Sequence, residues 1–190
     1  MKKKSWYPVE NSKCIIEIMV EDLEQLFDER DPNPFLNKDL DDDAVEYILS
    51  SAEEIGNNRI GKLRIVCSER PDDSSIDIAT SAIKKFFLYR ADISQKKIRK
   101  IFSTGWKSLL IGTAFLALAI VGSAVVKHYL ADTLVGEFLT EALVLIGWVS
   151  MWKPVNIFLY EWWPLIDQKK TFETLNQLPL EITSRKPQEI

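Results

Sequence analysis

Four aspartates form the densest group of possible metal ligands in this 190-residue chain: Asp39, Asp41, Asp42 and Asp43. Mg²⁺ and Ca²⁺ prefer carboxylate oxygens, but this group lacks the alternating ligands and central glycine of a calcium-binding EF-hand loop. Carboxylates also stabilise the positive end of a helix dipole. We therefore interpret these four residues, together with Asp72 and Asp73, as helix caps, and we expect no metal or other cofactor.

Other catalytic motifs are missing from the sequence. His128 is the single histidine, which argues against a His-based triad or a zinc site. Gly56 and Gly61 flank a turn without the spacing of a phosphate-binding loop. Cys14 and Cys67 form no CxxC motif, and we expect them to be reduced, buried thiols. An enzyme that uses carboxylates, with or without a metal, stays open as one alternative.

Glu141 is the residue with the most unusual setting, because it lies in an otherwise apolar segment, residues 134–152. An ionisable side chain inside a bilayer is costly and often functional. Helical spacing places Glu137, Leu145, Trp148 and Trp152 on the same face. One hypothesis is a path for cations or protons in a multimer. The alternative is a protonated or hydrogen-bonded glutamate near the outer interface, paired with His128, Thr113 or Ser123.

Residues 108–126 are an uninterrupted apolar run between Lys107 and Lys127. As a helix its 19 residues rise about 28 Å, close to the ~30 Å hydrocarbon core of a bilayer. The second apolar run follows after a short connection, so we predict a transmembrane helical hairpin over residues 104–152. Small residues on the first helix allow close helix packing: Gly112, Ala119, Gly122 and Ser123.

Basic residues predict how this hairpin is oriented. Five of them precede the first span: Lys96, Lys97, Arg99, Lys100 and Lys107. More follow the second span, from Lys153 onward, whereas the loop between the spans has only Lys127. The positive-inside rule therefore predicts that both termini are cytoplasmic. The five basic residues can also bind anionic lipid headgroups, although topology alone is a sufficient explanation of them.

An aromatic segment follows the second span and includes Trp152, Lys153, Pro154, Trp162 and Trp163. Tryptophans at this position are typical of an anchor at the membrane interface. A proline in a helix can also kink it, so a hinge at Pro154 is the alternative interpretation.

Residues 1–103 are expected to form a small cytosolic α/β domain with a basic juxtamembrane helix. Alternation of apolar residues predicts strands at 13–20 and 62–67, and helical spacing predicts helices at 22–29, 41–55 and after Pro71. The fold class is therefore an α+β membrane protein, with a two-stranded domain followed by the hairpin. Two strands are too few to be stable alone, which favours a homo-oligomer. We expect residues 153–190 to form the interfacial segment and a cytosolic tail.

Charge is distributed unevenly along the chain, although the net charge is only −4. Residues 21–43 contain ten carboxylates and are a possible surface for a protein partner. The acidic isoelectric point gives no support for nucleic-acid binding.

Two segments, DPNPFLNKDLDDDAVEYIL (residues 31–49) and MWKPVNIFLYEWWP (residues 151–164), resemble recurring blocks of a group of uncharacterised bacterial two-span membrane proteins. The resemblance implies the architecture and a bacterial setting, but no activity. Our first hypothesis is a non-enzymatic inner-membrane protein that acts as an oligomeric scaffold, sensor or regulatory subunit. The alternatives are a small oligomeric channel or membrane-perturbing effector gated by the cytosolic domain, and a membrane-bound enzyme.

Overall fold

The computed structural model describes residues 6–33, 38–130 and 133–185. The chain divides into two compact units. The first combines residues 1–93 with residues 167–190, and the second consists of residues 94–166. The sequence-based division had instead kept residues 153–190 as a separate segment.

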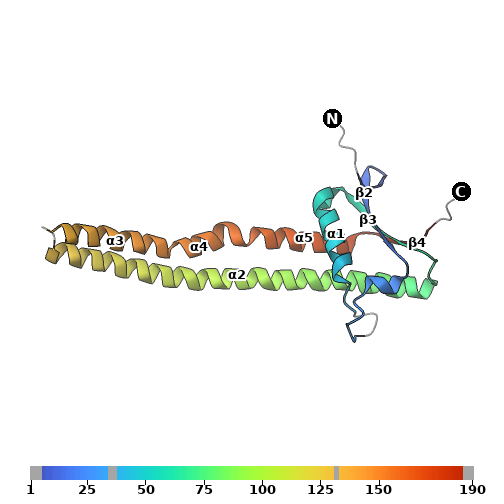
Figure 1. Cartoon of the computed structure of the whole chain (residues 1–190), viewed down its shortest axis with the longest axis horizontal. Coiled ribbons are helices and arrows are strands. Elements are labelled where there is room, and N and C mark those ends of the chain that lie inside the picture. Colours follow the sequence, from blue (N-terminus) through green and yellow to red (C-terminus); the bar gives the residue numbers. More distant parts are fainter. Residues whose placement is uncertain (1–5, 34–37, 131–132, 186–190) are drawn as a thin grey trace. The chain divides into compact units, whose positions relative to one another are not determined.

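The first unit is built on a sheet with the strand order β1-β2-β3-β4 (Figure 1). The strands are β1 (Val9–Glu10), β2 (Lys13–Val20), β3 (Ile60–Cys67) and β4 (Leu180–Ser184). β1 pairs antiparallel with β2, whereas β3 is parallel to both of its neighbours. The two predicted strands are confirmed as β2 and β3, but the expectation of a two-stranded domain is wrong because the sheet has four strands.

β4 comes from the segment that the sequence analysis treated as a tail. Its short sequence alternates, so that Leu180 and Ile182 pack against the hydrophobic core while Glu181 lies on the opposite face. The register pairs Leu63 with Leu180 and Cys67 with Ser184. A strand of five residues is too short to fold alone, but it is stable here because β3 offers a complementary edge.

The connection from β2 to β3 contains a long helix, α1 (Asp42–Ile55). The Asp41 carboxylate accepts hydrogen bonds from the backbone of Asp43 and Ala44, which confirms the predicted N-cap. Gly56 follows with a φ of 85°, a left-handed conformation that favours glycine. The predicted helix at 22–29 is shorter, a single 3₁₀ turn at η1 (Leu23–Leu26). Another 3₁₀ turn, η3 (Asn57–Arg59), leads into β3.

Two further helices contribute to the core of the first unit, α2 (Asp73–Leu130) and α5 (Trp163–Gln177). Asp72 directly precedes α2, and its carboxylate accepts hydrogen bonds from Ser74 and Ser75 that lower its pKa to about 2. The buried rings of Phe87 and Phe172 join the core from α2 and α5. Because the inward side chains of the strands belong to the same cluster, the helices cover one face of the sheet.

The other face of the sheet carries a network of ion pairs. Arg64 on the central strand β3 contacts carboxylates on all three other strands: Glu10, Glu17 and Glu181. Lys62, two residues earlier, lies 2.6 Å from Glu10 and 2.5 Å from Glu181. These contacts raise the pKa of Arg64, chiefly through Glu10, and tie the four strands together on the side away from the helices.

The second unit is a helical hairpin. α2 continues to Leu130, and α3 (Leu134–Ser150) follows with Thr133 as its N-cap. After α3 come α4 (Trp152–Asn156), a π-helical turn η4 (Ile157–Glu161) and the first residues of α5. The helix predicted to begin after Pro71 therefore continues past Asp92 without a break. Two helices are long and apolar enough to span a membrane, one in each arm of the hairpin.

Candidate functional site

The packing side of the hairpin is lined by small residues. A Cβ atom on Gly147 would lie 2.9 Å from both Ala119 and Leu116, and one on Gly112 would lie 2.9 Å from the Ser150 carbonyl oxygen. The Ser150 hydroxyl in turn donates to the backbone carbonyl of Gly147 at 2.6 Å and lies 3.1 Å from that of Gly112. Gly112 and Ala119 therefore lie on the helix contact, as their small size suggested.

The opposite face of α3 is exposed in the single chain. It presents four of the residues that helical spacing placed together, Glu137, Glu141, Leu145 and Trp148, and the fifth, Trp152, is exposed at the start of α4. Within the described residues no side chain pairs with the Glu141 carboxylate. Of its three expected partners, Ser123 is buried, Thr113 lies 4.0 Å from the Met151 sulfur, and the exposed His128 contacts the Tyr129 ring.

An aromatic cluster closes the other end of the hairpin. The Phe102 ring lies 6.1 Å from the rings of both Phe158 and Trp162, and Trp106 lies 5.7 Å from Phe158. Trp162 also donates a 2.8 Å hydrogen bond from its indole to the Phe158 carbonyl oxygen, and its ring lies 5.4 Å from that of Trp163. These ring contacts therefore join α2 to η4 and to Trp162, where the chain leaves the apolar part of the hairpin.

Pro154 is buried in this region, within the first turn of α4. Proline has no N–H to donate to the Ser150 carbonyl, so the helical pattern is interrupted at Met151. The π-helical turn η4 follows directly, and its end is held by Glu161, which accepts hydrogen bonds from Lys153 and Asn156. The segment named as a hinge or anchor therefore contains two breaks in regular helical geometry, at Met151 and at η4.

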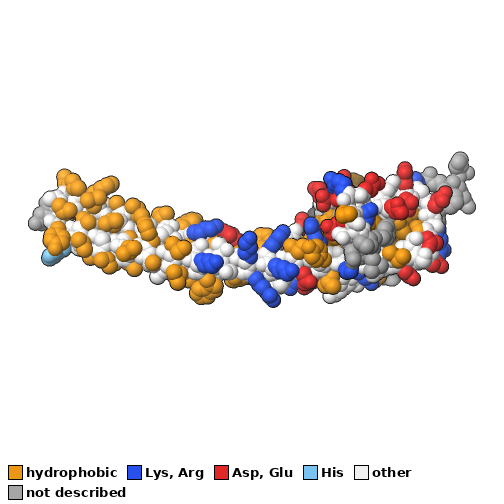
Figure 2. All heavy atoms as spheres, turned by 90° about the horizontal axis from the view of Figure 1, so that it is seen from below, with side chains coloured by type: hydrophobic (Ala, Val, Ile, Leu, Met, Phe, Trp, Pro, Cys, Tyr) orange, Lys and Arg blue, Asp and Glu red, His pale blue; other side chains and the backbone are white. Residues whose placement is uncertain are grey.

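A band of exposed positive charge borders the aromatic cluster on α2. The five predicted basic residues are all exposed: Lys96, Lys97, Arg99, Lys100 and Lys107. Lys153 is exposed on the other arm. Figure 2 shows lysine and arginine side chains gathered beside the apolar surface of the hairpin. Exposed cations next to tryptophans and a mainly apolar surface are the composition of a membrane interface.

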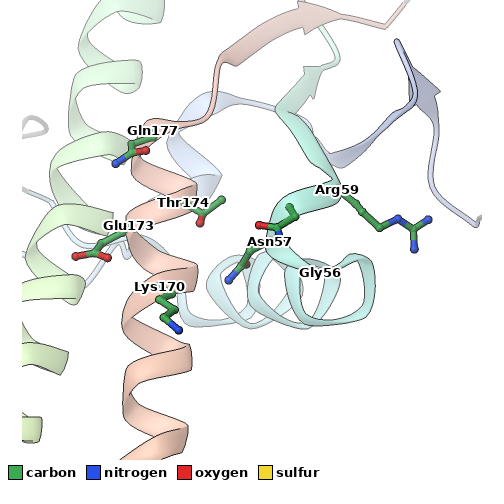
Figure 3. A pocket seen from close by; sticks show the side chains of 8 residues that line it. Gly56, Asn57, Arg59, Lys170, Glu173, Thr174 and Gln177 are labelled. Carbon is green, nitrogen blue, oxygen red and sulfur yellow. The ribbon is translucent and has the colours of Figure 1, made fainter.

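A polar pocket of about 690 Å³ lies in the first unit. It is lined by the turn after α1 and by α5: Gly56, Asn57, Asn58, Arg59, Lys170, Glu173, Thr174 and Gln177. Asn57 donates a 3.1 Å hydrogen bond to Thr171, and Glu173 is paired with Lys169. Figure 3 shows the Arg59 side chain extending away from α5. The sequence did not predict this pocket because its two walls are far apart in the chain and neither contains a motif.

The acidic residues do not gather around a common point. In the part of the chain that the structure describes, no three His, Cys, Asp or Glu side chains are placed to hold a metal ion. Asp41 instead caps α1 and Asp72 caps α2. Cys14 and Cys67 are buried and form no disulfide with each other, and burial raises the pKa of the Cys67 thiol.

Together these features define an α+β protein whose sheet unit is joined to a hairpin of two membrane-length helices with a cationic, aromatic border. No protein-family model, curated protein or solved structure matches the chain significantly. Inference about function therefore starts from the geometry of the hairpin and of the sheet unit.

Proposed function

We propose that this chain is a bacterial inner-membrane protein that displays its α/β unit in the cytoplasm. It acts as a scaffold, sensor or regulatory subunit rather than as an enzyme. The hairpin is its membrane anchor, both termini are cytoplasmic, and several copies work together. The acidic segment at residues 21–43 is a candidate surface for a protein partner.

The exposure of the apolar helices is the observation that carries this proposal. Only 17% and 11% of their most apolar segments are buried. More than ten large apolar side chains between residues 106 and 152 are exposed. Each would gain roughly 1.5–3 kcal/mol by leaving water. The sum exceeds the typical total stability of a domain, about 5–15 kcal/mol, so this surface needs an apolar environment such as lipid.

The basic border supports the same orientation. Lys96, Lys97, Arg99 and Lys100 precede the first span, and each gains about 1 kcal/mol near the anionic headgroups of a cytoplasmic leaflet. Trp106, which is 65% exposed, lies between Lys100 and Lys107 in sequence, and tryptophan prefers the headgroup level of the bilayer. Anionic lipid is therefore a proposed binding partner of this border.

Cysteine accessibility tests the anchor and its orientation. Because Cys14 and Cys67 are buried, the natural chain is a low-background control for labelling with a membrane-impermeant maleimide. We expect Tyr129→Cys, near the connection between the spans, to be labelled in bacterial spheroplasts. Asn58→Cys, in the exposed turn before β3, should react only after permeabilisation. Recovery of the protein in the soluble fraction, or labelling of Asn58→Cys from outside, would refute the proposal.

The exposed position of Glu141 favours a second candidate function. An unpaired carboxylate on the outer face of α3 is unfavourable in lipid but suits the interior of an assembly of hairpins. In this alternative the copies form a small ion-conducting channel or a membrane-perturbing effector controlled by the cytoplasmic unit.

A further inference from the structure

The outer edge of the sheet has backbone groups that no described strand covers. β4 is last in the strand order and pairs only with β3 (Figure 1). Leu63 N–H donates to the Pro179 carbonyl, and Arg185 N–H donates to the Cys67 carbonyl. In a parallel ladder alternate residues direct both backbone groups to the same side. Leu180, Ile182 and Ser184 therefore direct their N–H and C=O groups toward the free edge.

The side chains of these residues make the edge apolar on its inner face. Leu180 and Ile182 pack against the core but are only partly buried. Natural edge strands usually avoid pairing through lysine, proline or a bulge. None of these devices occurs in the LEITS sequence of β4, and its register with β3 is regular.

The charge on the outer face of β4 is already compensated. Glu181 lies 2.5 Å from Lys62 and 3.2 Å from Arg64, both on β3. A second negatively charged strand approaching this edge is therefore not opposed by a free carboxylate. Both the backbone and the side chains of β4 are suited to another strand of the same sequence.

We propose that two copies of this chain pair antiparallel through β4, with Ile182 on the two-fold axis. Ile182 then faces Ile182 of the second copy, and Leu180 faces Ser184. Every outward N–H and C=O of these three residues finds a partner, and the two hydrophobic cores meet at Ile182. A register centred on Glu181 would place two like charges opposite each other, which is unfavourable.

This pairing deepens the proposed function, because it names how copies of the anchored protein associate. The pairing rests on the proposed function only because both copies must be anchored in the same membrane. Labelling with maleimide reports the anchor and crosslinking reports the edge, so a failure of one is distinguishable from a failure of the other.

Disulfide crosslinking of the full chain in native membranes tests the pairing. Opposed residues in a hydrogen-bonded antiparallel pair have Cα atoms about 5.5 Å apart, within the range of a disulfide. Under oxidation Ile182→Cys should give a covalent dimer. Asn58→Cys, which is exposed but away from this edge, and the natural chain, whose cysteines are buried, should not. A yield from Ile182→Cys no higher than from Asn58→Cys would overturn the proposal.

A second variant removes one outward donor and leaves the existing sheet intact. The N–H of Ser184 does not bond to β3, so Ser184→Pro spares the ladder with β3, whereas Ser184→Ala keeps the donor. In the Ile182→Cys background, Ser184→Pro should lower the dimer yield about tenfold and Ser184→Ala should not. Equal yields from the two variants at equal thermal stability would contradict the edge. A dimer in detergent in which the Ile182→Cys residues fail to crosslink would show that the copies associate through another surface and would also refute it.

Discussion

The phenyl ring of Phe87 in α2 lies 6.4 Å from the ring of Phe172 in α5, and both rings are buried. The whole hairpin separates the two residues in sequence. Arg90 adds a cation–π contact to the Phe172 ring, at 5.9 Å from its centroid. The first unit is therefore closed by contacts between the chain that enters the hairpin and the chain that leaves it.

Replacing Phe172 by alanine should destabilise the first unit by about 3–5 kcal/mol, the usual cost of removing a buried phenyl ring. Trp163→Ala, at a position that is 60% exposed, should change the stability much less. Limited proteolysis of both variants in detergent measures the effect. Equal protease resistance would mean that the aromatic contact contributes little.

The ion-pair network predicts a loss of stability in acid. Hydrogen bonds from Lys62 hold the pKa of Glu10 and of Glu181 below their ordinary value of 4.5. A lowered pKa in the folded state stabilises it above the unfolded value, and this contribution is lost as the pH falls through the folded pKa. We expect the melting temperature of the sheet unit to fall as the pH drops below about 4.5.

Arg64→Gln isolates the part of this effect that belongs to the network. It should lower the free energy of unfolding by about 1–3 kcal/mol at neutral pH, because it removes charged hydrogen bonds on a central strand. It should also flatten the acid dependence of the melting temperature. An unchanged slope would assign the acid sensitivity to other carboxylates.

Gly147 and Gly122 form a matched pair for testing the hairpin. A Cβ on Gly147 would lie 2.9 Å from Ala119, whereas the nearest atom to one on Gly122 lies at 3.6 Å, an ordinary contact. Gly147→Ala should therefore cost about 1–3 kcal/mol through overpacking. Gly122→Ala should be neutral. Thermal unfolding of both variants in the same detergent provides the comparison, and equal midpoints would contradict the packing face described here.

Asp41→Ala should destabilise α1 by about 1 kcal/mol through loss of its N-cap. Asp43→Ala leaves the capping carboxylate in place and should have a smaller effect. Adding Mg²⁺ or Ca²⁺ should not shift the melting temperature of the natural chain if capping is the role of this group. A cation-dependent shift of the melting temperature that Asp41→Ala abolishes would instead support a metal site.

The Glu141→Gln substitution distinguishes the two candidate functions of the hairpin, membrane anchor and ion channel. If the hairpin is only an anchor, liposomes with the natural chain should show no ion flux above empty liposomes, and the substitution should change nothing. If the hairpins form a channel, flux should be present and Glu141→Gln should alter its rate or selectivity. Glu137→Gln, one turn closer to the connection between the spans and on the same face, shows whether the second carboxylate of that face contributes.

Local patterns in the sequence predicted the elements that depend on local physics. The alternation in residues 13–20 and 62–67, the cap at Asp41 and the uncharged run at 108–126 each identified an element that the structure contains. β4 was missed because its five residues become a strand only by pairing with β3, which is distant in sequence. For the same reason the polar pocket between Asn57 and Thr174 had no signal in either segment.

The irregular helix that follows α3 shows a different limit of prediction from sequence. Pro154 indicated an irregularity, but the π-helical turn at Ile157–Glu161 depends on contacts of Phe158 and Glu161 with residues on both sides. The burial of Ile157 against Gly105 also needs the second helix in place. Sequence spacing identified the segment but not the form of its backbone.

The position of β3 between β2 and β4 has a consequence for biosynthesis. The ribosome makes β2, α1 and β3 first, then both apolar helices, and only afterwards α5 and β4. Until those last elements emerge, Phe87 lacks its contact with the Phe172 ring and one side of β3 has no neighbouring strand. The sheet unit therefore reaches its final form only after the hairpin has been synthesised. A chain whose synthesis stops within the hairpin would expose Phe87 and the unpaired edge of β3 to chaperones and proteases. These features would distinguish it from a chain that contains α5 and β4.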